Sequence, residues 1–241
     1  LLAVYGYAVQ IYCDFSAYSD IAIAVAALLG FRFPRNFNQP YRAQRLREFW
    51  QRWHISLSTW LRDYLYKPLG GNRRGRLKTY RNLMLTMLLG GIWHGAGWKF
   101  VMWGALHGGG LAAERLLEPW LGRTSRPASR GARVLATLVV FHFVCLAWIF
   151  FRAEDFAVAR LYIGGLGQGW GEGVEQAGPF MVLLIGLGLA GQFLPARLFE
   201  HTVETLQRVP VWGIGAAAGL LVALINAVGP EGVAPFIYFR F

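Results

Sequence analysis

Long apolar runs alternate with basic, polar stretches along this chain. The apolar runs occupy residues 3–30, 83–113, 134–151, 179–195 and 211–229. A helix needs about 20 apolar residues to cross a bilayer. The run 83–113, with 31 residues, is long for one crossing and short for two, whereas each of the others suits one. The pattern therefore predicts an all-α fold, a polytopic membrane helical bundle in which 83–113 is a broken helix or a re-entrant hairpin.

Residues 46–66 show the clearest helical periodicity in a polar part of the chain. Apolar side chains recur there at spacings of three and four: Leu46, Phe49, Trp50, Trp53, Leu57, Trp60, Leu61 and Tyr64. At 100° per residue these positions form one stripe of a single helix. A basic amphipathic helix with Trp on its apolar face is typical of the membrane interface. A helix packed against other helices of the same protein fits equally well.

Composition and charge agree with a membrane protein. Hydrophobic residues make up 55% of the chain and charged residues 15%, against roughly 25% charged in soluble domains. The net charge of +11 is concentrated, since residues 32–81 hold 13 Arg or Lys but only Glu48 and Asp63. The positive-inside rule places 32–81 and 114–133 in the cytoplasm and the acidic segment 152–178 outside. Because these cations flank apolar runs, the lipid bilayer is the expected partner and nucleic acid is not.

The remaining bulk features bear on domain organisation. Turn residues mark loops at 68–75 and 164–173, and no internal repeat interrupts the chain, which predicts a single membrane domain over residues 1–241. Cys13 and Cys145 both lie in apolar runs, so structural thiols are favoured over a disulfide. The chain starts at Leu1, almost directly in an apolar run, which predicts a piece of a longer protein.

Polar side chains gather within the first apolar run, between Tyr12 and Asp20. On a helix Asp14 and Tyr18 share one face, and Ser16 and Asp20 share another. Polar groups at membrane depth are costly, so this segment must pack inside the bundle or line a wet cavity. A hydrogen-bonded packing network and a wall of a reaction chamber both fit, and the residues alone leave the choice open.

His94 lies among glycines and tryptophans in Gly90-Gly-Ile-Trp-His-Gly-Ala-Gly-Trp98. Glycine lets another backbone or a substrate approach closely. A neutral imidazole in such a place can act as a general base on a hydroxyl. A buried histidine that donates to a backbone carbonyl fits the same pattern.

The other histidines carry weaker signals. His54, between Trp53 and Ile55, has the setting of a packing residue, and His107 lies in a second glycine-rich stretch. No pair of histidines has metal-ligand spacing, so a metal site built from His54, His94 and His107 is not expected. Neither a nucleophile elbow nor a phosphate-binding loop is present.

Taken in order, these stretches resemble the membrane-bound O-acyltransferase superfamily and, within it, the bacterial alginate O-acetylase branch. The likeness is densest over residues 5–110 and returns in the last residues. The stretches that carry it are Tyr12-Cys-Asp-Phe-Ser-Ala-Tyr-Ser-Asp-Ile-Ala-Ile23, Gly30-Phe-Arg-Phe-Pro-Arg-Asn-Phe-Asn-Gln-Pro-Tyr41, Glu48-Phe-Trp-Gln-Arg-Trp-His-Ile-Ser-Leu-Ser58, Trp60-Leu-Arg-Asp-Tyr-Leu-Tyr-Lys-Pro-Leu-Gly-Gly-Asn-Arg73, Gly90-Gly-Ile-Trp-His-Gly-Ala96 and Phe236-Ile-Tyr-Phe-Arg-Phe241.

The resemblance implies a site and a fold. His94 matches the histidine regarded as catalytic, and His54 matches the second histidine of a Trp-His-x-Ser motif. Family members are longer and surround a central tunnel, so this chain corresponds to their C-terminal half. No metal and no bound cofactor are implied. The residues expected to line the tunnel or position substrate are Asp14, Ser16, Asp20, Trp93, Trp98, Arg62 and Asn72.

The resemblance also implies a reaction. Alginate-type members take an acetyl group from a cytoplasmic donor, acetyl-CoA or another acyl donor, and pass it across the bacterial plasma (inner) membrane. A periplasmic esterase-like acetyltransferase partner then places it on an exported polysaccharide such as alginate. His94 would supply the base, and an indole N–H of Trp93 or Trp98 or a backbone N–H would stabilise the oxyanion. The basic segment 32–81 would hold the phosphates of the donor.

Other functions stay open at this point. Within the family, the alternatives are D-alanyl transfer to teichoic acid and acetyl transfer to peptidoglycan or cellulose. Outside it, a proton-coupled transporter would use Asp14, Asp20 and His94 as a proton path. A non-catalytic scaffold would tolerate substitution of both His54 and His94.

Overall fold

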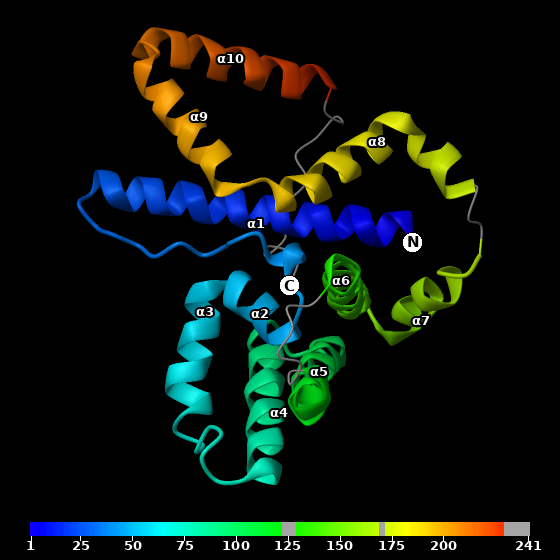
Figure 1. The fold of residues 1–241 in the computed structure, drawn as a ribbon. Helices are drawn as coiled ribbons and strands as arrows, with labels where there is room; N and C mark the ends of the chain where they lie inside the picture. The colour runs from blue at the N-terminus through cyan, green and yellow to red at the C-terminus, as the bar shows by residue number, and fades with distance from the viewer. Residues whose placement is uncertain (122–128, 169–171, 229–241) are drawn as a thin grey trace. The chain divides into compact units, whose positions relative to one another are not determined.

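The computed structural model describes residues 1–121, 129–168 and 172–228, and these residues form helices, turns and loops without a strand (Figure 1). This confirms the all-α prediction. The chain divides into two compact units, the first from Leu1 to Gln192 and the second beginning at Phe193. A single membrane domain over 1–241 stays a prediction, and the family-like stretch 236–241 lies outside the described residues.

Two helices are long and apolar enough to cross a membrane within these ranges. They are α1 (Leu2–Leu28) and α6 (Arg130–Arg152), which coincide with the predicted spans 3–30 and 134–151. A third candidate span arises only if the consecutive helical stretches 178–193 and 197–208 are counted as one. The protein is therefore membrane-integral by the length and composition of its helices.

The predicted run 83–113 is interrupted, as both a broken helix and a re-entrant hairpin require. Helix α4 (Arg76–Trp93) ends just before His94, and α5 (Trp98–Leu121) begins after a four-residue turn. The two helices form a closely packed hairpin, because a Cβ at Gly91 would meet the backbone oxygen of Phe100 and one at Gly104 that of Met87. Glycine at these two positions is therefore required by the approach of one backbone to the other.

The prediction of one continuous helix over 46–66 is wrong. Three segments replace it: α2 (Leu46–Arg52), α3 (Ile55–Trp60) and the π-helical turn η2 (Leu61–Tyr66). The chain breaks between the first two because His54 adopts a left-handed backbone conformation, with φ 44° and ψ 56°, that no helix can continue.

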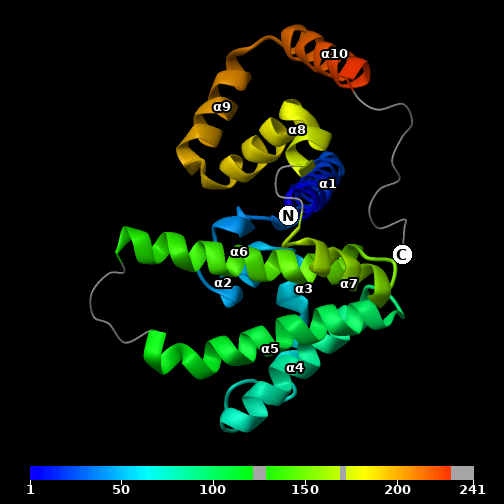
Figure 2. The same cartoon turned by 90° about the vertical axis from the view of Figure 1, so that its right-hand side faces the viewer.

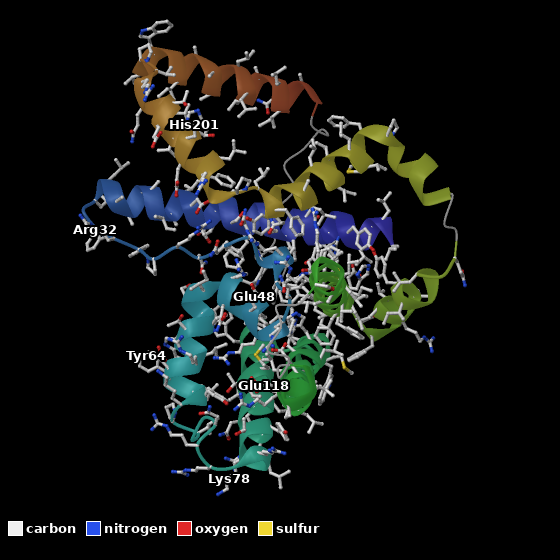
Figure 3. The ribbon with its side chains drawn as sticks, viewed as in Figure 1. Arg32, Glu48, Tyr64, Lys78, Glu118 and His201 are labelled. Atoms are coloured by element: carbon white, nitrogen blue, oxygen red, sulfur yellow. The ribbon has the colours of Figure 1, made fainter. Side chains whose placement is uncertain are left out.

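The apolar side chains of 46–66 differ in burial along the stretch. Leu46, Phe49 and Trp53 are buried in the protein, whereas Trp60 and Tyr64 stay exposed. Tyr64 projects outward from its segment, away from α4 and α5 (Figure 3). Leu61, between these two exposed residues, is buried. The packed interpretation therefore applies to most of the stripe, and a place at the membrane interface stays a prediction for Trp60 and Tyr64.

Helix α6 packs between α1 and α5 in the first unit, as two perpendicular views show (Figure 1, Figure 2). Aromatic rings from these helices and from α2 fill the space between them. Tyr41, in the short helix η1 (Pro40–Arg42), ties this core to α1 by donating its hydroxyl to the backbone oxygen of Ala8 at 2.7 Å. The deeply buried rings include Phe49, Tyr41, Trp53, Trp103, Trp148 and Phe151.

The remaining helices complete both units. In the first, α7 (Phe156–Gly165) and α8 (Glu172–Ala190) follow α6. The turn η3 (Gly191–Phe193) follows α8 and contains the boundary between the units. In the second, α9 (Ala196–Arg208) precedes α10 (Val211–Val228). Helices α8 and α10 occupy the predicted apolar runs 179–195 and 211–229, whereas α7 and α9 were not predicted. In α9 the apolar Leu198, Phe199, Val203 and Leu206 recur at helical spacing among charged residues.

Candidate active site

His94 lies in the turn between α4 and α5, where it caps the C-terminus of α4. Its half-buried ring meets rings from three helices. The centroid of the His94 ring lies 4.9 Å from that of Trp93, 5.2 Å from Trp103 and 5.1 Å from Phe151, and each pair meets edge to face. The site is therefore built where the glycine-rich hairpin meets the end of α6.

His54 is held from a segment that precedes it by eighteen residues. Its ring nitrogen Nδ1 lies 3.2 Å from Oδ1 of Asn36, and the same oxygen accepts the backbone N–H of Ser56 at 3.2 Å. The ring packs edge to face on Phe15, with centroids 4.7 Å apart. Burial lowers the pKa of His54 to about 4, so the imidazole is neutral near pH 7.

Trp93 lies between the two histidines. Its ring centroid is 6.4 Å from that of His54 and 4.9 Å from that of His94. The two imidazoles are also near enough to interact electrostatically. The structure thus brings together three of the residues predicted for the site, although His54 and His94 are forty residues apart in the chain.

The predicted polar residues of α1 do not all reach this region. Asp14 and Ser16 are half-buried, and Asp20 is exposed. The buried polar residue of the segment is Ser19, whose Oγ accepts a hydrogen bond from Nδ2 of Asn36 at 3.1 Å. Ser19 and Asn36 thus connect α1 to His54. Ser19 lies in the polar stretch 12–20 and Asn36 in the family-like stretch 30–41, but neither was predicted as a site residue.

The tryptophans near His94 differ in burial. Trp93 is 61% exposed and Trp98 is 76% exposed, whereas Trp103 is 2% exposed. Among the described residues, the indole N–H of Trp103 has no hydrogen-bond partner. A buried N–H without an acceptor is unfavourable by about 1–3 kcal/mol. Trp103, which was not predicted and whose ring contacts that of His94, is therefore a candidate hydrogen-bond donor for this region.

A cavity of about 800 Å³ opens between the segment 45–73 and helices α4 and α5. Apolar side chains such as Ile55, Leu83 and Met87 form part of its wall, and neither His54 nor His94 lines it. Two residues predicted to position substrate, Arg62 and Asn72, do line it. Its charged lining residues are Arg45, Arg47, Arg62, Lys67, Arg73, Arg115, Glu114 and Glu118.

Some of these cations are paired and others are not. Asp63 binds Arg62 at 2.9 Å and Lys67 at 2.7 Å. The hydrogen bonds from Arg62 and then Lys67 hold the pKa of Asp63 well below its usual range. Arg115 binds Glu118 at 2.8 Å. Within the described ranges, ion pairs to a carboxylate are found for none of Arg45, Arg47 and Arg73.

Glu114 has a structural partner of its own. Its carboxylate accepts the backbone N–H groups of Leu46 at 2.5 Å and Arg47 at 3.4 Å, at the start of α2. A carboxylate at a helix N-terminus stabilises that end. The cavity therefore keeps a net positive lining. In the described parts of the chain, no group of three or more His, Cys, Asp or Glu side chains is arranged to hold a metal ion.

Comparison with known proteins gives one family and several relatives. The model of MBOAT, the membrane-bound O-acyltransferase family, matches residues 1–154. The probable alginate O-acetylase AlgI of Azotobacter vinelandii is 54% identical over 162 residues, which are 67% of this chain and 31% of that protein. The peptidoglycan O-acetyltransferase of Helicobacter pylori is 46% identical over 161 residues, 67% of this chain and 30% of that protein.

A more distant relative extends the comparison. The teichoic acid D-alanyltransferase of Bacillus subtilis is 32% identical over 165 residues, which are 65% of this chain and 42% of that protein. The chain thus spans about a third of the length of the alginate and peptidoglycan relatives it matches.

Proposed function

The chain belongs to the membrane-bound O-acyltransferase family, and we propose that it carries the catalytic histidines of a bacterial inner-membrane enzyme that transfers an acetyl group toward an exported polysaccharide. The observation that carries this proposal is the meeting of His54 and His94 around Trp93. A pair of half-buried imidazoles on separate helical segments is an arrangement suited to moving a proton.

His94 acts as the general base. Its ring nitrogen takes the proton of an attacking hydroxyl while the hydroxyl oxygen forms a bond to the carbonyl carbon of the acyl donor. When the donor is a thioester, the carbon–sulfur bond then breaks, and the imidazolium returns the proton to the departing thiolate. His94 is thereby restored, and one acyl group has moved from sulfur to oxygen.

Trp103 stabilises the oxyanion that forms during attack. Its indole N–H is buried, and its ring contacts that of His94 at 5.2 Å. A hydrogen-bond donor that is already in place in a site without water stabilises a developing negative charge far more than a donor in water does. The exposure of Trp93 and Trp98 makes them weaker candidates for this role.

The cavity binds the anionic part of the acyl donor. Arg45, Arg47 and Arg73 offer charge that no described carboxylate neutralises, and the apolar wall suits the aliphatic part of a carrier such as CoA. Ile55 lines the cavity and directly follows His54, so a donor held here would have its reactive end near the histidines. Acetyl-CoA and a carrier protein with a phosphopantetheine arm share this chemistry.

Alginate is the polymer we propose, together with a periplasmic esterase-like acetyltransferase as the partner that completes the transfer. The support is the 54% identity to a probable alginate O-acetylase, against 46% to a peptidoglycan O-acetyltransferase and 32% to a teichoic acid D-alanyltransferase. Acetyl transfer to peptidoglycan or cellulose and D-alanyl transfer to teichoic acid are the other outcomes of the test below.

The test uses the intact protein in its own membrane. Membranes are supplied with radiolabelled acetyl donor, and label is followed into each exported polymer. His94→Ala is expected to reduce incorporation by a factor of about 10² or more, while His201→Ala, on the exposed surface of α9, leaves it unchanged. Unaltered acetylation in His94→Ala would contradict the proposal. Proton-coupled solute uptake without donor turnover would favour a transporter instead.

A further inference from the structure

The backbone at His54 is held in an unusual conformation. His54 and Gln39 are the non-glycine residues with positive φ in the described chain. Two main-chain hydrogen bonds flank His54: the N–H of Asn38 donates to the oxygen of Arg52 at 2.9 Å, and the N–H of Ile55 donates to the oxygen of Asn36 at 2.9 Å. A left-handed histidine persists only where its surroundings hold it, and such residues concentrate at functional sites.

The side chain of Asn36 adds four contacts. Its Oδ1 accepts the backbone N–H of Ser56 at 3.2 Å and the hydroxyl of Ser56 at 2.9 Å, and it faces Nδ1 of His54 at 3.2 Å. Its Nδ2 donates to Oγ of Ser19 at 3.1 Å. One amide thus joins α1, the loop before α2 and the start of α3.

These contacts determine which ring nitrogen of His54 carries the proton. A backbone N–H can only donate, so the atom of Asn36 that faces Ser56 must be the oxygen. The hydroxyl of Ser56 also lies 3.4 Å from Nδ1 of His54, but it donates to Oδ1 of Asn36 at the shorter distance of 2.9 Å. Because an amide oxygen can only accept, the contact between Asn36 and His54 assigns the donor role to Nδ1. In a neutral imidazole the other nitrogen, Nε2, then holds a free lone pair.

We propose that Asn36 is a positioning residue that keeps the proton of His54 on Nδ1, so that Nε2 accepts a hydrogen bond from an O–H or N–H group of the bound substrate. Asn36 therefore acts on the reaction through His54. Its anchor is Ser19, which connects the polar segment of α1 to His54. The substrate in this statement rests on the proposed acyl transfer, whereas the position of the proton does not.

The opposite ring assignment at His107 provides an internal comparison. There the indole N–H of Trp50 donates to Nδ1 at 3.3 Å, so that ring carries its proton on Nε2. The two histidines are therefore expected to give distinct ¹⁵N ring signals in one sample, because the protonated and unprotonated ring nitrogens differ in chemical shift.

The experiment is ¹⁵N NMR of the intact, histidine-labelled protein in lipid, near neutral pH. Signals are assigned by their loss in His54→Gln and His107→Gln. The proposal expects an Nδ1–H ring at position 54, and Asn36→Leu is expected to abolish this preference and to reduce acyl transfer by about 10² or more. Asn36→Asp, whose carboxylate also accepts from Nδ1, is expected to retain the signal and restore much of the activity.

Asn38→Ala is the matched control, because it keeps the main-chain bond to Arg52 and leaves Asn36 intact. If Asn36→Leu does not fold, the ring signals of His54 in the unmodified protein and in Asn36→Asp still test the proposal. An Nε2–H ring at position 54 in either, or an unchanged ring and full activity in Asn36→Leu, would overturn the proposal. An Nδ1–H ring combined with full activity of His94→Ala would overturn the proposed function instead and leave this inference standing.

Discussion

Trp50 donates its indole N–H to Nδ1 of the fully buried His107 at 3.3 Å, and through this bond the wall of the basic cavity touches the aromatic interior. On one side Trp50 lines the cavity. On the other, the ring of His107 lies 4.8 Å from that of Trp103, which in turn contacts His94. The proposed donor site and the proposed oxyanion donor are therefore parts of one packed layer.

Trp50→Phe keeps most of the ring volume and removes this hydrogen bond. Because Nδ1 of His107 would then be buried without a donor, we expect a loss of about 1–3 kcal/mol in stability. Resistance of the folded protein to denaturant in lipid or detergent measures it. His107→Phe in the same background is expected to recover part of the loss, since both polar partners are then absent. If His107→Phe instead reduced the stability of Trp50→Phe by an equal further amount, the hydrogen bond would not explain the first loss.

Two glycines of the α4–α5 hairpin are expected to be intolerant of alanine. In Gly91→Ala and Gly104→Ala the new methyl group would overlap backbone atoms of the facing helix, which cannot move without separating the helices. Overpacking of this kind destabilises proteins by about 1–3 kcal/mol or more. Gly109→Ala is the control on the same helix, because its methyl would meet only the end of Met84 at 3.8 Å. Yield of folded protein and thermal inactivation distinguish the three.

Trp103→Phe tests the proposed oxyanion donor. The phenyl ring keeps the contact with His94 but lacks the N–H group. We therefore expect kcat to fall by a factor of about 10²–10³, with little change in the affinity for the acyl donor. Trp98→Phe, at an exposed position, is expected to stay near the activity of the unmodified protein. A fall in folded protein rather than in kcat would assign Trp103 to packing alone.

The unpaired arginines of the cavity are expected to act on donor affinity. Arg45→Gln, Arg47→Gln and Arg73→Gln should each raise KM for a phosphorylated donor, because charge-assisted contacts to phosphate contribute about 1.5–3 kcal/mol each. High salt should have the same effect on the unmodified protein. Arg160→Gln, on the exposed side of α7, is the control. An unchanged KM in all three variants would remove the cavity from the donor site.

The pKa of His54 makes stability depend on pH in a definite direction. Burial lowers this pKa from 6.5 to about 4. Between these two pH values, His54 is therefore protonated in the unfolded chain and neutral in the folded protein. Stability contributed by His54 is therefore complete above about pH 6.5 and is lost as pH falls toward 4. Denaturation midpoints measured across this window should fall less steeply in His54→Gln. Parallel pH profiles of the two proteins would show that another group is responsible.

Residue patterns alone indicated the membrane character and the two described helices that are long and apolar enough to cross a membrane. The lengths of the apolar runs located α1 and α6, and the glycines around His94 indicated the break between α4 and α5, because burial in lipid and close backbone approach depend on local residue types. The ordered motifs also indicated the family, which the match over residues 1–154 establishes.

The tertiary structure alone decided how the site is held. Helical periodicity ran unbroken through 46–66, yet hydrogen bonds from residues 36–38 turn the backbone at His54, and periodicity contains no information about a partner so far away. Likewise Trp103 and Trp98 look alike in the sequence, and only packing against α2 and α6 buries one and exposes the other. Contacts between distant segments therefore decide how His54 and Trp103 are held, whereas the lengths of the apolar runs indicate only which helices can cross a membrane.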